Sequence, residues 1–392
     1  MSFPERFSAL PDYAFPRVRK LLDGIAPGGP VVDMTIGEPK HAFPAWVGDV
    51  LAANISGFGR YPANDGTADL LAAIADWIAR RYGVTLDPTT QIMALNGTRE
   101  GLFNAGIALC PEQKHGSRPA VLMPNPFYQA YALAALAVSA EPVYVAATAA
   151  TGFLPDYAAL PDDILDHAAL CYICSPANPQ GAVAGRGYWK KLIALAEKHD
   201  FQILADECYS EVYRDEPPYG AFQAAAEFGA DPERVVVFNS LSKRSSLPGL
   251  RSGFVAGGPE SIRRIKQLRA FAGAPLPLPL QAVATRAWGD ETHVTESRSL
   301  YSEKLDIADR VFAGIQAYQA PDAGFFLWLP VADDETAVMT LWRETGVKTL
   351  PGSYLSRSVN AENPGKGYIR VALVGPASET ERGLTAIRNT LY

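Results

Sequence analysis

Seven short apolar runs alternate with helix-like stretches between about residues 67 and 260. In residues 67–82, for example, Leu70, Ile74 and Ile78 recur at the spacing of one helix face. The apolar runs predict buried strands at 92–95, 120–123, 142–146, 170–174, 202–205, 235–238 and 253–256. Strands that alternate with helices favour an α/β fold with a mostly parallel sheet covered by helices on both faces.

A second and smaller pattern follows a proline-alternating stretch at 275–279, which we expect to be extended. It predicts a smaller α+β unit, with helices at 293–316 and 335–345, strands at 325–330 and 368–373, and a last helix. The first 45 residues have no sheet pattern of their own. We expect an N-terminal segment, 1–45, that packs with the small domain, a large domain, 46–280, and a small domain, 281–392.

Composition narrows the class of protein. Hydrophobic residues make up 48% of the 392 residues and charged residues 20%, a balance typical of a globular protein. The 35 basic and 42 acidic residues give a net charge of -7, which argues against nucleic acid or an anionic membrane as the main partner. No apolar run is long enough to span a bilayer, and the first residues lack a signal-peptide pattern. These features predict a cytoplasmic protein.

The cysteines and histidines do not suggest a metal site. Four cysteines are too few for a disulfide scaffold, and the pair Cys171 and Cys174 lies within an apolar run. Their odd spacing places them on opposite faces of a strand, so we interpret them as buried thiols. The five histidines are scattered without metal-ligand spacing, and we expect no metal.

Polar residues follow the predicted strands where the carboxyl edge of the sheet should lie, the place where ligands bind in such sheets. Ser240, Ser242, Lys243 and Arg251 come after the strand at 235–238. Hydroxyls and an arginine can hold a phosphate, and an enclosed lysine beside it can form a Schiff base with an aldehyde cofactor. Taken alone, such a lysine is more often a surface or structural residue.

Three further strand ends carry candidate residues, each with a simpler alternative. Asp206 could bind a positively charged ligand group, or it could cap a helix. Asn178 could contact a ligand or be a turn residue. Thr98 and Arg99 open a predicted helix, whose first N–H groups could bind an anion, although many helices begin in this way.

Taken together, these segments resemble the class I aminotransferases, pyridoxal-phosphate enzymes of fold type I. Within the class they are similar to the N-succinyl-diaminopimelate aminotransferases. The resemblance extends over nearly the whole chain. Its motifs are IGEPKH at 36–41, PNPFY at 124–128, DECYSE at 206–211, SLSKRSSLPGLRSGF at 240–254 and LPGSY at 350–354. It implies a pyridoxal 5'-phosphate cofactor and a large domain with a mostly parallel seven-stranded sheet sandwiched by helices, beside the smaller α+β domain.

The resemblance also implies a role for each site residue. Lys243 holds the cofactor covalently and acts as the base, Asp206 pairs with the pyridine nitrogen, and Asn178 and Tyr209 bond the phenolic oxygen. The ring is covered by an aromatic residue at the position of Tyr128. The phosphate is surrounded by Thr98, Arg99, Ser240, Ser242 and Arg251. Arg370 binds the substrate α-carboxylate beside Gly37 and Asn178, and Tyr61 reaches the phosphate of the other subunit of a homodimer.

The expected reaction is transfer of an amino group from glutamate to N-succinyl-2-amino-6-oxopimelate, so that the partners are small amino and keto acids. Arg17, Arg19 and Arg244 are candidates for its distal carboxylates only because they lie near motif segments, and arginines in such places are more often solvated surface residues. The alternatives are acetylornithine, aspartate or aromatic transaminases and other pyridoxal-phosphate reactions. More remote alternatives are a non-catalytic sensor and an S-x-x-K serine hydrolase, since Ser240 and Lys243 have that spacing.

Overall fold

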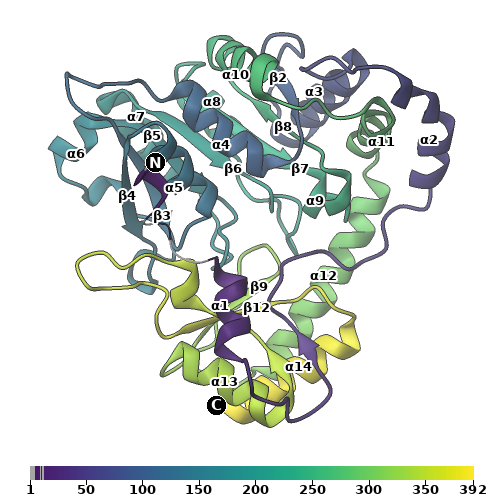
Figure 1. The fold of residues 1–392 in the computed structure, drawn as a ribbon, viewed down its shortest axis with the longest axis vertical. Helices are drawn as coiled ribbons and strands as arrows, with labels where there is room; N and C mark the ends of the chain where they lie inside the picture. The colour runs from purple at the N-terminus through teal and green to yellow at the C-terminus, as the bar shows by residue number, and fades with distance from the viewer. Residues whose placement is uncertain (1–4, 9, 11–12) are drawn as a thin grey trace, which may run out of the picture.

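A computed structural model describes residues 5–8, 10 and 13–392 of the chain. A large part with one extended sheet lies above a smaller part that contains both the N-terminal helix α1 and the C-terminal helix α14 (Figure 1). None of the helices in the described ranges is long and apolar enough to cross a membrane.

The large sheet has seven strands, as predicted, in the order β2-β8-β7-β6-β5-β3-β4. Only β8 runs antiparallel to its neighbours. The strands are β2 (Ile92–Leu95), β3 (Ala120–Asn125), β4 (Glu141–Ala146), β5 (Ala168–Cys174), β6 (Gln202–Asp206), β7 (Val235–Ser240) and β8 (Gly253–Ala256). Because β8 enters where the parallel strands end, the polar segments around all these strands meet at one edge.

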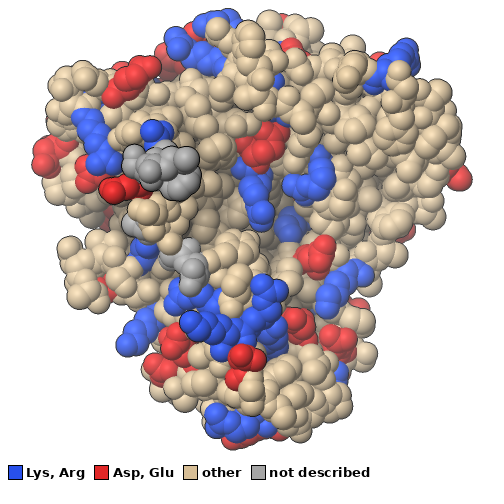
Figure 2. All heavy atoms as spheres, viewed as in Figure 1, with Lys and Arg blue, Asp and Glu red and all other residues tan. Residues whose placement is uncertain are grey.

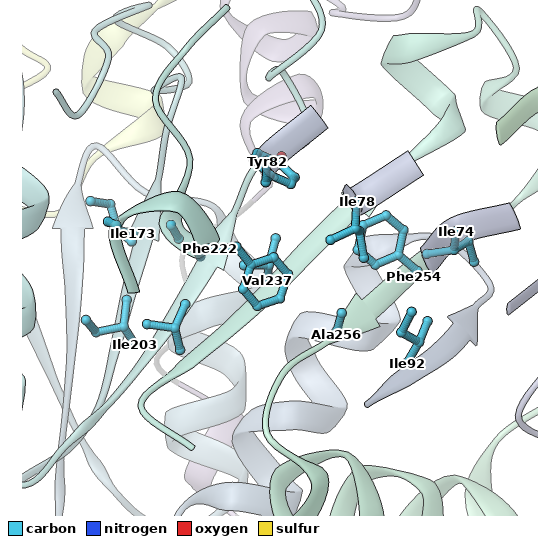
Figure 3. Close-up of a cluster of buried hydrophobic side chains, with 14 of the residues drawn as sticks. Ile74, Ile78, Tyr82, Ile92, Ile173, Ile203, Phe222, Val237, Phe254 and Ala256 are labelled. Carbon is cyan, nitrogen blue, oxygen red and sulfur yellow. The ribbon is translucent and has the colours of Figure 1, made fainter. Parts of the chain in front are cut away.

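Helices cover both faces of this sheet. On one face, alternate strand residues such as Ile203, Val237 and Phe254 pack under α3 and α8 (Figure 3). On the other face, Leu204, Val236 and their neighbours pack under α4, α5 and α10. The helices of the large part are α2 (Val47–Ala53), α3 (Ala68–Tyr82), α4 (Thr98–Leu109), α5 (Gln129–Ala137), α6 (Asp162–His167), α7 (Arg186–His199), α8 (Ala221–Phe228), α9 (Leu241–Arg244), α10 (Pro259–Ala272) and α11 (Leu278–Gly289).

The smaller part has a three-stranded antiparallel sheet and its own apolar core. Its elements are α1 (Ala14–Leu21), α12 (Thr292–Val311), β9 (Phe326–Pro330), α13 (Asp334–Thr345), β11 (Leu350–Pro351), β12 (Tyr368–Ala372) and α14 (Ala377–Leu391). Contrary to our expectation, the first residues do contribute a strand: β1 (Val32–Asp33) pairs in parallel with β10 (Val347–Lys348). Each of these strands has only two residues, and the two segments lie more than three hundred positions apart. Neither strand could therefore be predicted from its own sequence.

One expectation about residues 275–290 needs correction. The proline stretch is not wholly extended, because α11 begins at Leu278 with Pro279 in its first turn. Proline is tolerated there since its missing N–H would have no intrahelical acceptor. The side chains of Val283 and Trp288 in α11 belong to the core of the large part. We therefore propose that the large domain continues to the end of α11, beyond the boundary expected at 280.

Candidate active site

A cavity of about 510 Å³ lies at the carboxyl edge of the large sheet, between the two parts of the chain. The register of the strands brings its walls together, because Cys174 pairs with Asp206 and Ser240 pairs with Gly253. The predicted site residues that line it are Gly37, Thr98, Arg99, Tyr128, Asn178, Asp206, Tyr209, Ser240, Ser242, Lys243, Arg251 and Arg370. Residues separated by more than three hundred positions in the chain thus face one space.

Lys243 extends into the cavity from α9, the single helical turn that follows β7. Its Nζ donates a hydrogen bond to the Gly37 backbone oxygen, which ties the large part to the loop after β1. Burial, with the charges of Arg370 and Arg251 also contributing, lowers the pKa of this amine to about 8, although Cys208 and Glu38 oppose the shift. An amine with this pKa is partly neutral near physiological pH, so it can act as a nucleophile or base.

Asp206 ends β6 and is buried at the base of the cavity. Its Oδ2 accepts a hydrogen bond from the Tyr131 hydroxyl at 2.7 Å, and its Oδ1 accepts one from the Cys208 N–H at 3.3 Å. Burial raises the pKa of the carboxyl, while these donors and the charge of Lys243 act to lower it. No ion pair to Asp206 is formed within the described residues. A buried carboxylate of this kind favours a cationic ligand group.

Arg370, Asn178 and Tyr209 form a hydrogen-bonded row along another wall. Arg370 Nη1 donates to Asn178 Oδ1 at 3.1 Å, and Asn178 Nδ2 donates to the Tyr209 hydroxyl at 3.4 Å. Arg370 Nη2 donates to the Thr35 backbone oxygen, and its guanidinium lies 4.4 Å from the centre of the Phe326 ring. Its pKa is lowered to about 10 by burial, so it stays cationic at neutral pH. Arg370 Nε is buried without a partner in the described residues, so a donor remains for an anionic ligand.

The opposite end of the cavity gathers hydroxyls and N–H groups. Ser240 Oγ lies 2.9 Å from Ser242 Oγ and accepts the Ser242 N–H, while the first turn of α4 begins at Thr98. Arg251 Nη2 bonds the Asn96 backbone oxygen at 3.3 Å, close to Gly97. A Cβ on Gly97 would lie 2.2 Å from that nitrogen, and the φ of Gly97 is +84°. Glycine is therefore required for Arg251 to sit beside the helix start, an arrangement suited to a phosphate.

Tyr128 and Arg99 stand at the rim of this cavity. Arg99 Nε donates to the Tyr128 hydroxyl at 2.5 Å, which holds both side chains in place. Burial raises the pKa of Tyr128 and the hydrogen bond to Arg99 partly opposes the shift. The tyrosine is thus a neutral aromatic surface in the lining of the cavity at physiological pH, and a surface of this kind can cover a flat ligand ring.

Other predicted residues lie elsewhere. Tyr61 does not line the cavity, and its side chain is fully exposed, at 101% of its reference area. Arg244 is buried away from the cavity, where its guanidinium donates to Ala287 O and Glu291, so it cannot bind substrate carboxylates. Arg19 lies exposed on α1 and does not line the cavity. Ser240 donates to Ser252 O and not to Lys243, contrary to what an S-x-x-K hydrolase needs.

Sequence reasoning overlooked Tyr131, which holds Asp206, and Tyr13 and Phe15, which line the cavity from the N-terminal segment. Tyr131 is the one hydroxyl in the apolar helix QAYALAALA. A buried tyrosine hydroxyl needs a hydrogen-bond partner, so the sequence could have indicated that Tyr131 faces a polar group. Tyr13 and Phe15 carried no signal, because only the docking of α1 brings them to the site.

Fold and site together define a class of protein. A mostly parallel seven-stranded sheet carries a lysine, a buried carboxylate and a cradle of hydroxyls and N–H groups at one edge, and a second part supplies a buried arginine. This is the arrangement of pyridoxal-phosphate enzymes of fold type I. No group of three or more metal-ligating side chains occurs in the part of the chain that the structure describes.

Comparisons with known proteins identify the family. The sequence profile of the class I and II aminotransferases matches residues 29–387. An aminotransferase structure from Neisseria meningitidis is similar, with 36% identity, a TM-score of 0.93 and 99% coverage of both chains. An LL-diaminopimelate aminotransferase of Moorella thermoacetica is 30% identical over 100% of this chain and 99% of its own. A structure described as a probable N-succinyldiaminopimelate aminotransferase from Thermus thermophilus has 26% identity and a TM-score of 0.84, covering 96% of this chain and 100% of its own. The chain belongs to the class I and II aminotransferases.

Enzymes of this family use pyridoxal phosphate, and the residues present fit that cofactor. Asp206 is a buried carboxylate without an ion-pair partner among the described residues, which suits a protonated ring nitrogen. The cradle that Gly97 leaves open beside Arg251 suits the phosphate. Lys243 lies in the same cavity with an amine that is partly neutral near pH 8, as covalent attachment to an aldehyde requires.

The hydrogen bond from Tyr131 to Asp206 predicts a measurable effect of its removal. Tyr131→Phe is expected to lower kcat about tenfold, because a hydrogen bond to a charged group contributes about 1.5–3 kcal/mol. Without this donor the pKa of Asp206 rises further, so the acid limb of the pH–rate profile should move to higher pH. Tyr172→Phe is the matched control, since its ring stacks on Tyr131 but its hydroxyl donates to Leu102 O. Equal profiles for the two variants would contradict the role of Tyr131.

Proposed function

We propose that this aminotransferase moves an amino group from glutamate to N-succinyl-2-amino-6-oxopimelate, a step in making diaminopimelate and lysine. The observation that carries the reaction is the convergence of Lys243, Asp206 and Arg370 on one cavity. The substrate is supported by the motif resemblance and by the relatives, several of which bear names of diaminopimelate aminotransferases.

Each residue has a task in this reaction. Arg370 binds the α-carboxylate of the amino acid with its guanidinium donors, and its stacking on Phe326 fixes their direction. Lys243 Nζ would take the proton from the substrate Cα and hold it, as a general base whose pKa of about 8 suits neutral conditions. Tyr128 and Asn178 restrict the position of the reacting carbon. When bound, pyridoxal phosphate supplies the electron-withdrawing ring that stabilises negative charge at Cα.

A second candidate substrate is LL-diaminopimelate itself, which is named in the relatives with 27–30% identity. One feature of the site favours it: Glu38, an exposed carboxylate, lines the cavity and could bind a free distal ammonium group. The two substrates differ in charge at this end, because succinylation replaces the ammonium group with an amide and a carboxylate. Kinetic comparison of the two as amino donors, with 2-oxoglutarate as acceptor, separates the candidates.

The visible spectrum of the purified protein tests the reaction class. Glutamate should convert the cofactor absorbance from the aldehyde form to the amine form, and 2-oxoglutarate should restore it, because the two half-reactions share one cofactor. N-succinyl-diaminopimelate should cause the same conversion. A spectrum that responds to neither amino acid would contradict the proposal, and a response to LL-diaminopimelate with none to the acylated compound would shift it to the second candidate.

We further propose a homodimer whose interface includes the segment around Tyr61. Family members are typically homodimers, and this segment exposes Ile55, Phe58 and Tyr61, with exposed fractions of 56%, 56% and 101%. Large apolar side chains exposed in one stretch are typical of an interaction surface. Tyr61 is then placed to reach the phosphate end of the partner's cavity.

Tyr61→Phe is expected to weaken cofactor binding about tenfold through loss of one hydrogen bond to a charged group. Titration of the apoenzyme with pyridoxal phosphate measures this effect. Tyr392→Phe, at a partly exposed tyrosine outside the segment around Tyr61, is the control. A protein that sediments as a monomer and keeps full cofactor affinity after Tyr61→Phe would contradict both the interface and the role of Tyr61.

A further inference from the structure

A second cavity of about 410 Å³ adjoins the active-site cavity. The two share a wall formed by Tyr13, Arg99, Phe127, Tyr128, Gln129 and Leu355. Because the same side chains face both spaces, the two cavities lie directly side by side at this wall. The second cavity is therefore adjacent to the site, and none of the roles assigned above uses it.

The lining of the second cavity combines apolar and basic side chains. Phe103, Leu133 and Tyr144 belong to its apolar lining, and Arg17 of α1 lines it as well. The charged lining residues are Arg17, Arg99, Arg357 and Glu100. The acidic one among them, Glu100, already forms an ion pair with Arg269 at 2.8 Å. The lining thus carries an excess of positive charge, although the protein as a whole has a net charge of -7.

Arg17 is oriented to bind a carboxylate. Its guanidinium lies over the Tyr354 ring, 3.5 Å from the ring centre, so that one face is covered while the N–H groups at its edge stay available. Within the described residues no aspartate or glutamate forms an ion pair with Arg17. Lys and Arg side chains gather around α1 on the surface shown in Figure 2, where Arg19 and Lys20 are exposed neighbours.

We propose that this cavity is the subsite for the distal arm of the substrate and that Arg17 binds the carboxylate at the end of that arm. The proposal rests on the proposed function, because it assumes an acylated dicarboxylic substrate held at its reacting end by Arg370. The methylene and amide part of the arm lies along Phe103, Phe127 and Leu133, and the succinyl carboxylate meets the guanidinium edge. Selection for a terminal carboxylate then lies in the N-terminal helix, outside the machinery that does the chemistry.

Two amino donors that differ only at the end of the arm test this subsite. N-succinyl-LL-diaminopimelate ends in a carboxylate, and N-butyryl-LL-diaminopimelate ends in a methyl group at the same position. Arg17→Gln is expected to raise KM for the succinyl compound about tenfold with little change in kcat, and to leave KM for the butyryl compound unaltered. Arg19→Gln is the matched control on the same helix and should behave as the unmodified enzyme. Equal effects of Arg17→Gln on both donors would overturn the proposal.

A second variant tests the cavity without touching the arginine. Leu133→Trp should fill the apolar part of the space and raise KM for both acylated donors, because both need room for the arm. If it changes neither KM, the arm does not enter this cavity and the proposal is wrong.

The failure of the subsite can be distinguished from the failure of the proposed function. N-succinyl-6-aminohexanoate carries both end carboxylates but no reacting amine, so it can serve as an inhibitor of the glutamate half-reaction. Its inhibition constant should rise about tenfold in Arg17→Gln and stay constant in Arg19→Gln. An unchanged constant in both variants overturns the subsite, whichever amino donor the enzyme uses. A rise specific to Arg17→Gln supports the subsite even if neither acylated diaminopimelate is converted.

Discussion

Lys243→Ala should abolish multiple-turnover transamination, with a loss of about 10⁴-fold or more, because it removes both the covalent anchor and the base. The amine lies in the cavity, and it donates a hydrogen bond to Gly37 O in the loop after β1. The same loop contains Thr35, whose backbone oxygen accepts a hydrogen bond from Arg370. Lys243→Arg is the informative partner variant, since it keeps the charge but never provides a neutral amine. Steady-state rates and the visible spectrum measure the outcome. Substantial turnover in either variant would contradict the assignment.

The same lysine predicts a pH dependence for cofactor uptake. Burial lowers the pKa of Lys243 from 10.5 to about 8, so the neutral and nucleophilic amine predominates above pH 8. The rate of covalent pyridoxal-phosphate incorporation into the apoenzyme should therefore rise as the pH increases through about 8 and then level off. An increase that continues toward pH 10 would mean that the amine is not desolvated in solution. Absorbance recorded after rapid mixing follows the incorporation directly.

The large sheet could be predicted from sequence because its strands are buried on both faces. Runs such as Val235–Ser240 and Ala168–Cys174 are buried at every position, so each appears as a continuous apolar segment that ends in polar residues. Polar residues at successive strand ends then converge, since parallel strands share one carboxyl edge. The convergence of Asp206, Asn178 and Lys243 follows from this single geometric rule.

Features that depend on tertiary docking could not be predicted in this way. Arg244 was a candidate because it follows Lys243, but one residue along a helix turns the side chain by about 100°. Its guanidinium instead lies 5.1 Å from the centre of the Trp288 ring, in the core. Arg17 was a candidate only by its place near a motif, and no local pattern placed it on the Tyr354 ring. The docking of α1 decides its surroundings.

The buried network behind Asp206 was also hidden, for a different reason. Tyr131 lies in a helix whose other residues after Gln129 are apolar, so the sequence indicates a simple core element. Its hydroxyl finds a hydrogen-bond acceptor because β6 ends beside it with the carboxylate of Asp206. A lone polar group in an apolar helix needs a partner, and the sequence does not say where that partner lies.

Asp206→Asn should lower kcat about 10²–10³-fold, a size typical of removing one electrostatic group aimed at the reacting centre. The neutral amide no longer stabilises a proton on the ring nitrogen, so negative charge at the substrate Cα is less well delocalised. Glu207→Gln is the matched control, because this neighbouring buried carboxylate faces away, toward the Tyr82 hydroxyl and the Ala221 N–H. Its loss should reduce stability more than kcat.

Asp206→Asn should keep or gain thermal stability as the apoenzyme although it loses activity. Folding raises the pKa of Asp206, mainly through burial, so the folded apoenzyme binds more protons than the unfolded chain at this position. It therefore loses stability as the pH rises from the unfolded pKa through the raised folded pKa. Asparagine removes the buried charge, and apo Asp206→Asn should melt at the same temperature as the unmodified apoenzyme or higher at neutral pH. A large drop in its melting temperature would mean that Asp206 is structural; a maintained melting temperature with lost activity would show that the buried charge is kept for the cofactor.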